Sequence, residues 1–363
     1  MTTEQMQLTE IRNQIDTIDA QIQDLIGQRA ACAQKVADIK TQGDNVDAVF
    51  YRPEREAQVL RAVKARNTSL LPDEEMAKLF REIMSACLAL EQPTTVAYLG
   101  PEGSYSHASV IKQFGSSVHS IAVSTIEEVF EAVEKGDASY GMVPVENSSE
   151  GVVKSTQNAL VTTDLKVSGE VALEIHHCLL SKSKTVENIH KIVAHQQALG
   201  QCEQWIKNNL PWAEIEAVAS NALAAKMAKT DSAVAAIASE QAAQLYQLNI
   251  LESHIEDQSD NSTKFWVVGR DATQSSGEDK TAMIVSMKNQ SGALLDILSC
   301  FSSRGINMTR IISRPSLDTT WDYQFFIDVM GHQEDENLKQ ALAEVKSKSA
   351  FFKLLGSFPV SPL

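Results

Sequence analysis

The sequence is poor in cysteine and contains no long apolar segment. Its 363 residues include five cysteines without CxxC spacing, namely Cys32, Cys87, Cys178, Cys202 and Cys300. An odd, scattered set predicts reduced thiols rather than a disulfide framework. No stretch approaches about 18 uninterrupted apolar residues, and the start, MTTEQMQLTE, resembles no export signal. The sequence therefore predicts a cytoplasmic protein without a membrane partner.

Basic residues are outnumbered by acidic ones. The chain has 32 Lys+Arg and 47 Asp+Glu, a formal net charge of −15, and no run of lysine or arginine. Such a surface would repel a nucleic-acid backbone, so DNA and RNA are not expected partners. Hydrophobic residues make up 43% of the 363 positions, which is enough to fill two or three domains.

Motifs that bind metals or nucleotides are also missing. The sequence contains no HxH, HExxH or Cys/His cluster, and no GxGxxG or P-loop motif. His176 and His177 are adjacent, so in a strand they would point to opposite faces and could not form a metal pair. The sequence predicts neither a metal nor a cofactor.

The first 92 residues have the periodicity of helices. From Leu8 to about Gln42 the apolar residues mostly recur every three or four positions, without proline. This predicts one helix on the order of 50 Å long, more than a segment of this size can cover, so a second chain is expected to pack on it. Two further helices are predicted over about 53–66 and 72–91, with prolines near their starts.

Three basic residues of the long helix have a defined spacing. Arg29 and Lys40 lie within about 20° of one helical face and about 16 Å apart along it. Arg12 lies about 100° away from that face and would more easily serve a neighbouring chain. Spacing alone leaves open whether these charges bind a ligand or form a solvated face.

From about residue 94 to 270, short apolar strands alternate with amphipathic helices, as in α/β domains. Strands are predicted near 96–99, 140–145, 191–194 and 233–237, each followed by a polar turn. Ligands of open α/β sheets bind beyond the carboxyl ends of strands. The turns GPEGSYSH, ENSSEG, HQQALGQ and ASEQ are therefore expected to converge on one cleft. His107 and His195 lie in these turns, where structural hydrogen bonding is preferred over catalysis.

The polar segment DATQSSGEDK, residues 271–280, reads as a linker before a third domain. The remaining residues, 281–363, predict the order strand, helix, strand, strand, helix, strand. That order is typical of an α+β ferredoxin-like βαββαβ unit.

The N-terminal region resembles the helical chorismate mutase domain of bifunctional enzymes of phenylalanine biosynthesis. The similar stretches are IRNQIDTIDAQIQDLIGQRAACAQKVADIK, YRPEREAQVL and LFREIMSACLALEQ. In that family two chains interlace, and the matching site positions are Arg12, Arg29, Lys40, Arg55, Glu56 and Glu91. The resemblance implies that arginines bind the carboxylates of chorismate, Lys40 faces its ether oxygen and Glu56 accepts from its hydroxyl. Rearrangement to prephenate then needs only a folded substrate and stabilisation of developing charge.

Position 91 departs from relatives that have glutamine there. The resemblance implies that this side chain also contacts the ether oxygen, to which a carboxyl group donates only when protonated. Glu91 therefore predicts an enclosed site and a raised pKa. Cys87 also differs, because some relatives have serine there.

The middle region resembles prephenate dehydratase, whose fold is two α/β lobes like those of periplasmic binding proteins. The similar stretches are YLGPEGSYSH, GMVPVENSSEG, HCLL, HQQALGQC, AAIASEQAAQLY and NSTKFWVVGR. The resemblance implies that Thr263 donates or relays a proton to the departing hydroxyl of prephenate. It assigns substrate orientation to Glu146, Asn147 and Gln201, and it implies that the polar run 261–264 faces the ligand. Ser104, Tyr105 and Ser239 are further candidates, with helix capping as the alternative for the two serines.

The C-terminal region resembles the ACT domain of the same enzymes in SGALLDILSCFSSRGINMTRIISRP and WDYQFFID. In relatives this domain binds phenylalanine at a dimer interface and inhibits the dehydratase. The matching positions are Gly292, Ala293, Leu294 and Asn307, with Ser313, Arg314 and Pro315 close by. Ile312 replaces the glutamate of the family's ESRP motif, which predicts altered sensitivity to phenylalanine.

Three functional hypotheses follow. The first is a bifunctional, cofactor-free enzyme that converts chorismate to prephenate and prephenate to phenylpyruvate, as a homodimer or dimer of dimers inhibited by phenylalanine. Its multidomain fold would comprise an all-α domain over 1–92, the two-lobed α/β domain over 94–270 and the ACT domain over 281–363. The second is a non-enzymatic amino-acid sensor. The third is a dehydratase whose mutase domain is a relic, because of Glu91 and Cys87.

Overall fold

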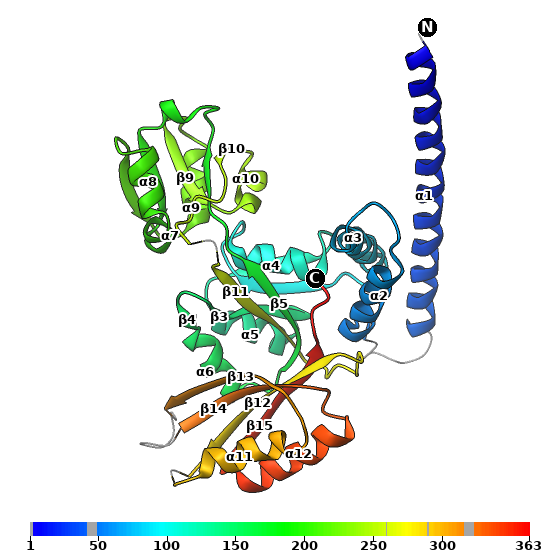
Figure 1. The fold of residues 1–363 in the computed structure, drawn as a ribbon, viewed down its shortest axis with the longest axis vertical. Helices are drawn as coiled ribbons and strands as arrows, with labels where there is room; N and C mark the ends of the chain where they lie inside the picture. The colour runs from blue at the N-terminus through cyan, green and yellow to red at the C-terminus, as the bar shows by residue number, and fades with distance from the viewer. Residues whose placement is uncertain (1–2, 42–48, 259, 289, 316–322) are drawn as a thin grey trace.

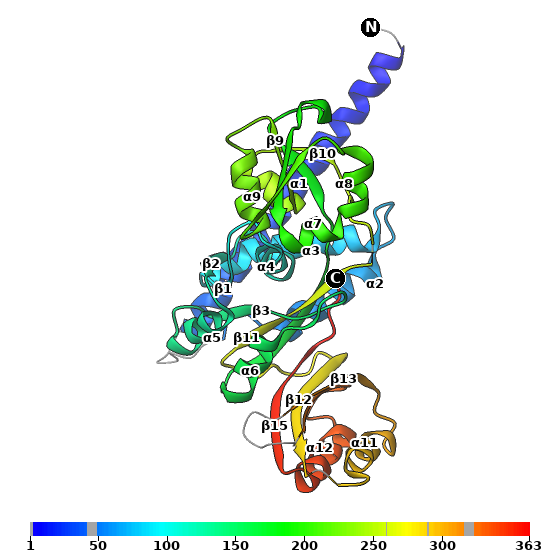
Figure 2. The same ribbon diagram turned by 90° about the vertical axis from the view of Figure 1, so that its left-hand side faces the viewer.

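The structure is a computed structural model that describes residues 3–41, 49–258, 260–288, 290–315 and 323–363. It contains a helical region, a two-lobed α/β region and a small α+β region, which confirms the predicted multidomain fold (Figure 1). The two lobes of the α/β region are lobe 1, which contains residues 95–174 and 262–269, and lobe 2, which contains residues 178–252. Lobe 2 and the C-terminal region lie on opposite sides of lobe 1 in both views (Figures 1 and 2). No helix within the described residues is long and apolar enough to cross a bilayer.

The helical region consists of α1 (Thr3–Thr41), α2 (Pro53–Arg66) and α3 (Asp73–Glu91). The predicted end of the first helix, about Gln42, lies outside the described residues. Buried Ala33 and Ala37 mark where α1 packs against α3. Farther toward the N-terminus α1 extends away from the molecule (Figure 1). There Ile11, Ile15, Ile18 and Ile22 are 53%, 50%, 52% and 49% exposed, so a single chain leaves the apolar face of α1 uncovered.

Lobe 1 is built on a mixed sheet with the strand order β2-β1-β3-β11-β5, and β4 pairs with β3. Its strands are β1 (Thr95–Leu99), β2 (His119–Val123), β3 (Tyr140–Asn147), β4 (Gly151–Val152), β5 (Lys166–Glu174) and β11 (Ser262–Gly269). Helix α4 (Tyr105–Phe114) packs on one face. Helices α5 (Ile126–Lys135) and α6 (Lys154–Thr162) pack on the other.

Lobe 2 is built on a sheet with the order β10-β6-β9-β7-β8. Its strands are β6 (Cys178–Ser181), β7 (Lys191–His195), β8 (Glu214–Val218), β9 (Val234–Ala238) and β10 (Asn249–Glu252). One face carries α7 (Gln196–Gln201) and α8 (Glu203–Asn209), the other α9 (Asn221–Ala228) and α10 (Glu240–Tyr246), and the short helix η1 (Val186–Asn188) precedes β7. The chain crosses between the lobes at 175–177 and returns through 253–258 and 260–261. The crossings are joined by Ile255 N–H, which donates to His177 O at 3.0 Å.

The C-terminal region has the predicted order of elements. These are β12 (Asp279–Met287), α11 (Ala293–Ser302), β13 (Met308–Pro315), β14 (Tyr323–Met330), α12 (Glu336–Lys348) and β15 (Phe351–Pro359). The strands pair antiparallel in the order β13-β14-β12-β15, a ferredoxin-like sheet. Both helices pack on one face.

The other face of this sheet packs directly on lobe 1. Trp266 of β11, Phe326 of β14 and Phe358 of β15 belong to one core, so the linker does not tether an independent body. At Gly356 the two backbones meet so closely that a Cβ would overlap the carbonyl oxygen of Val167. Gly356 also has φ +148°, which disfavours any residue with a Cβ.

Replacing this glycine tests the packing. We expect Gly356→Ala to lower the free energy of unfolding by about 1–3 kcal/mol, because an added methyl group forces the two sheets apart. Gly200→Ala is the matched control, since a Cβ there meets no atom within 4 Å. Urea denaturation that shows equal midpoints for the two variants would contradict close packing at Gly356.

Candidate active sites

A cavity of about 350 Å³ lies between the two lobes, within the size range of small-molecule sites. Three of the four turns predicted to converge line it, through Tyr105, Asn147 and Gln201. The fourth turn does not line the cavity. Its Ser239 donates to the carbonyl of Gly103 at 3.2 Å and so supports the first turn.

Asn147 and Thr263 face each other at neighbouring ends of β3 and β11. Asn147 Nδ2 donates to Thr263 Oγ1 at 2.8 Å and to Asn261 Oδ1 at 2.9 Å. Asn147 Oδ1 accepts from the N–H groups of Ser149 and Glu150 at 2.9 and 3.0 Å. These contacts fix the amide, because its oxygen only accepts and its nitrogen only donates.

The fixed amide determines what the Thr263 hydroxyl can do. A hydroxyl has one proton to donate. Because the Thr263 oxygen accepts from Asn147, its own proton is left for another partner, and the side chain lines the cavity. Thr263 is 9% exposed, so little bulk water competes for that proton. The arrangement suits donation to a bound ligand.

A second polar chain runs from lobe 1 to lobe 2 through His177, which lies between the lobes. Its Nε2 is 2.8 Å from Gln201 Oε1, and its Nδ1 is 2.8 Å from the Tyr105 hydroxyl. Burial lowers the pKa of His177, so the ring is neutral at pH 7. The Gln201 oxygen can only accept, so Nε2 carries the ring proton and Nδ1 is left as an acceptor. The Tyr105 hydroxyl is also 2.8 Å from the backbone carbonyl of His176, so its one proton is shared between that carbonyl and Nδ1. The Gln201 amide nitrogen then remains to donate to a ligand.

His177 was not among the predicted site residues, although a signal was present. Adjacent residues of an extended segment face opposite sides, so one of His176 and His177 had to face the cavity. The sequence did not show which one, because that depends on where the crossing segment twists between the lobes.

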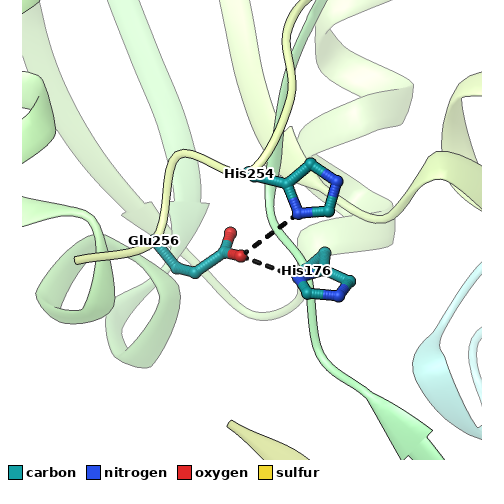
Figure 3. Close-up of side chains that lie close together, drawn as sticks. All are labelled: His176, His254 and Glu256. Atoms are coloured by element: carbon teal, nitrogen blue, oxygen red, sulfur yellow. Dashed lines mark hydrogen bonds and ion pairs between the residues drawn. The ribbon is translucent and has the colours of Figure 1, made fainter. Parts of the chain in front are cut away.

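The other histidine, His176, belongs to a cluster with His254 and Glu256 (Figure 3), and none of the three lines the cavity. His176 Nδ1 is 2.8 Å and His254 Nδ1 3.6 Å from Glu256 Oε1. Glu256 Oε2 accepts from the N–H of His177 at 2.8 Å. The three side chains could supply ligands to a metal, but the 2.8 Å separation is that of a hydrogen bond. Although burial lowers it, hydrogen bonds to Glu256 and Glu174 raise the pKa of His176 overall.

Glu146, a predicted substrate contact, does not line the cavity. Its carboxylate accepts from Arg310 Nε of β13 at 3.0 Å, on the side of the sheet that faces the C-terminal region. The cause is a bulge, because Lys264 pairs with Glu146 and Phe265 with Pro144, which leaves Val145 unpaired. The bulge lets Asn147 face the cavity while Glu146 faces away.

The polar run 261–264 is divided in the same way. Asn261 and Thr263 line the cavity, whereas Ser262 and Lys264 do not. Lys264 lies 3.8 Å from Glu170 of β5. The expectation that all four residues face a ligand was therefore wrong for Ser262 and Lys264, because side chains alternate along a strand.

Two serines considered as ligand contacts cap helices. Ser104 accepts from the N–H of His107, and Ser239 from that of Ala242. His107 stacks on Tyr98 and accepts from the N–H of Gly103, which is a structural role.

The helical region brings together three of its six predicted site residues. Glu91 is near both Arg29 and Lys40, and burial raises its pKa although the two cations oppose the shift. Lys40 Nζ donates to the carbonyl of Val49 at 3.0 Å and lies 4.9 Å from the centre of the Phe50 ring. The raised pKa predicted for Glu91 is confirmed in direction.

The other three positions lie elsewhere within one chain. Arg12 is exposed and, at seventeen residues from Arg29, is about 25 Å away along α1. Arg55 is exposed, and Glu56 forms an ion pair with Arg81 of α3 at 3.3 Å. One chain therefore holds only part of the predicted mutase site.

The predicted effector positions are divided between two faces. Gly292, with φ +84°, precedes α11, whose first turn contains Ala293 and Leu294. Asn307 and Ser313 are exposed. Arg314 is turned toward lobe 1 and donates to Asn158 of α6 at 2.6 Å. Because Ser313 and Arg314 are adjacent in β13, they cannot serve one ligand from the same face.

Comparison with known families agrees with this arrangement. Profiles of Chorismate mutase type II, Prephenate dehydratase and the ACT domain match residues 11–92, 96–273 and 281–347. The bifunctional chorismate mutase/prephenate dehydratase of Pseudomonas aeruginosa is 47% identical over 363 residues, 99% of this chain and 100% of that protein. The chain belongs to this bifunctional family. The relative from Aquifex aeolicus is 41% identical over 97% of this chain and 98% of its own.

Solved structures extend the comparison. A prephenate dehydratase from Arthrobacter aurescens, solved in complex with L-Phe, is 33% identical with a TM-score of 0.67 and covers 74% of this chain and 90% of its own. A protein described as a quorum quenching acylase, GqqA, is 29% identical with a TM-score of 0.68 and covers 74% of this chain and 98% of its own. The bifunctional family therefore shares its dehydratase fold with proteins of different described activity.

The raised pKa of Glu91 gives a test of the helical site. If protonated Glu91 donates to the ligand, mutase activity falls as pH rises through that pKa, because the proton is lost. We expect Glu91→Gln to flatten the profile, since an amide donates at every pH. Cys87→Ser should keep the fall. A pH series of chorismate consumption that is equal in wild type and Glu91→Gln would exclude this role.

His176 gives a second pH test. Its pKa is raised on folding, so its contribution to stability is complete below about pH 6.5, the unfolded value, and is lost as pH rises through the folded value. We expect the free energy of unfolding to fall less between pH 6 and 9 in His176→Gln than in wild type. Parallel urea-denaturation curves for both proteins over this range would refute the contribution.

Proposed function

We propose that this chain rearranges chorismate to prephenate in its helical region and converts prephenate to phenylpyruvate in the inter-lobe cavity. Membership of the bifunctional family supports both activities. The hydrogen bond from Asn147 to Thr263 is the observation that supports dehydratase activity in the cavity, because it leaves the Thr263 proton for a ligand. The ACT domain supports a regulatory role, and phenylalanine is the proposed effector because a solved relative is described in complex with it.

The mutase step requires no acid, base or nucleophile. A compact conformer of the chorismate dianion has to be held while charge develops on the breaking ether bond. Arg29 and Lys40 provide positive charge near Glu91, and a protonated Glu91 can donate to the ether oxygen. Arg12 would come from a second chain, whose helix would cover the exposed isoleucines of α1. A homodimer is therefore part of the proposal, and pairing of dimers through the ACT domains extends it.

In the dehydratase step the ring hydroxyl leaves as water and one carboxylate leaves as carbon dioxide. The electron pair of the breaking carbon–carbon bond enters the ring and expels the hydroxyl, to which Thr263 gives a proton. One proton is consumed overall, and solvent restores it to Thr263. A threonine hydroxyl is a weak acid, so it needs a fixed geometry and a dry site, which the Asn147 amide and the burial of Thr263 supply.

An acylase activity, as described for GqqA, is a second candidate that the cavity supports less well. Acyl transfer by a hydroxyl or thiol needs an adjacent general base. Among the described residues Thr263 contacts the Asn147 amide, which is not a base, and His177 contacts Gln201 and Tyr105. Burial raises the pKa of the Cys202 thiol, which disfavours the nucleophilic thiolate.

The assay that tests the proposal supplies chorismate to purified protein and measures its loss and the phenylpyruvate formed. We expect both signals in wild type. Thr263→Val should lower phenylpyruvate formation by about 10²–10⁴-fold, the usual contribution of a positioned proton donor, and leave chorismate loss unchanged. Thr263→Ser should retain most activity because it keeps the hydroxyl.

Each hypothesis predicts its own outcome. A sensor would give neither signal, and a dehydratase with a relic mutase would consume prephenate but not chorismate. Turnover of prephenate by Thr263→Val at the wild-type rate would reject the assignment of Thr263.

A further inference from the structure

Arg310 of β13 reaches from the ACT sheet to the back of the strands that form the cavity. Its Nε donates to Glu146 Oε2 at 3.0 Å. Its guanidinium carbon lies 5.4 Å from the centre of the Trp266 ring. Nη1 is 3.7 Å from Asp328 of β14, and the Arg310 side chain is only 6% exposed. Arg310 therefore links the ACT sheet to both β3 and β11.

These contacts are made by strand neighbours of Asn147 and Thr263, the two residues proposed to act in the dehydratase reaction. Glu146 precedes Asn147 in β3, and Trp266 follows Thr263 by three residues in β11. The unpaired Val145 of the bulge interrupts the ladder just before Glu146. Beyond the bulge, Glu146 and Asn147 pair with β11 on one side and β4 on the other, so a displacement of Glu146 is passed directly to Asn147 and its strand neighbours.

Because Arg310 is buried, its charge depends on the contact with Glu146 for compensation. Within the described residues, Nη1 and Nη2 have no hydrogen-bond partner although both are buried. Burial raises the pKa of Asp328 to about 6 although Arg310 opposes the shift. Among the residues that the structure describes, Glu146 is thus the one carboxylate within hydrogen-bond distance of the guanidinium. A buried charge with few partners favours one arrangement strongly, because movement away from Glu146 leaves it only the longer ion pair to Asp328.

We propose that Arg310 is a positioning residue for the dehydratase reaction, which acts through Glu146 and Trp266 to hold Asn147 and Thr263 in place. The ACT domain then forms part of the working dehydratase even without an effector. This inference rests on the proposed function of the cavity. It also gives Glu146 a role that does not require contact with substrate.

Side chains along β13 point alternately toward lobe 1 and toward the exposed face of the ACT sheet. Arg310, Ile312 and Arg314 face lobe 1, and Ile312 packs against the shared core. Ile311 and Ser313 are exposed on the opposite face. A ligand that shifts β13 from that exposed face would move Arg310 with it. Inhibition by phenylalanine would therefore depend on Arg310.

The test compares kcat and KM for prephenate in Arg310→Met, Arg310→Lys, Glu146→Gln and the double variant Arg310→Met/Glu146→Gln. Lys353→Met is the matched control, because Lys353 also crosses the interface but binds the carbonyls of Val161 and Thr163, remote from β3. We expect Arg310→Met to lower kcat at least 10-fold with KM changed less than 3-fold, and Arg310→Lys to restore part of kcat. The double variant should be no slower than Arg310→Met.

Three further measurements separate positioning from loss of fold. Chorismate consumption and the thermal midpoint should be close to wild type in Arg310→Lys, while its inhibition by phenylalanine is weakened. Equal kcat in Arg310→Met, Lys353→Met and wild type would overturn the inference and leave the proposed function intact. If Arg310→Met does not fold, a wild-type kcat in both Arg310→Lys and Glu146→Gln overturns it. A wild type without prephenate turnover would overturn the proposed function and this inference together.

Discussion

The pairing of β3 with β11 is the constraint on which the rest of the structure depends. Asn147 and Thr263 are 116 residues apart in the chain, yet their side chains form one hydrogen bond. The chain leaves lobe 1 after β5, builds all of lobe 2 and returns to place β11 between β3 and β5. A single strand insertion therefore creates the two lobe crossings, the cavity between them and the pair that lines it.

The same sheet serves two purposes on its two faces. One face ends at the cavity, and the other shares a core with the ACT sheet around Trp266, Phe326 and Phe358. Such packing leaves little freedom for one body to move alone, because close-packed interiors transmit displacement. A bulge at Val145 directs Glu146 to one face and Asn147 to the other. Adjacent residues of β3 therefore contact the ACT sheet and the cavity.

The helical region, unlike the inter-lobe cavity, does not bring all of its predicted site residues together within one chain. Its ligand groups are spread along a helix of 39 residues, and the described residues of one chain collect only Arg29, Lys40 and Glu91. An exposed row of isoleucines on the same helix offers the surface on which a second copy could complete the site. In the proposed homodimer, stability and function of this region would be coupled, because the contact that buries the apolar face would also bring the remaining charges.

The sequence by itself determined the family, the helical and ferredoxin-like regions and several strands of the α/β region, because periodicity and turn chemistry are local properties. The three N-terminal helices and the βαββαβ order were predictable, whereas strands β2, β4, β5, β8 and β10 were not predicted. It also identified Asn147, Gln201 and Thr263, which line one cavity. The tertiary structure alone decided which neighbour faces which way, as for Glu146 beside Asn147, Ser313 beside Arg314, and His176 beside His177. Those choices depend on a bulge, on the twist of a crossing segment and on the sheet packed behind, all of which involve residues far apart in the chain.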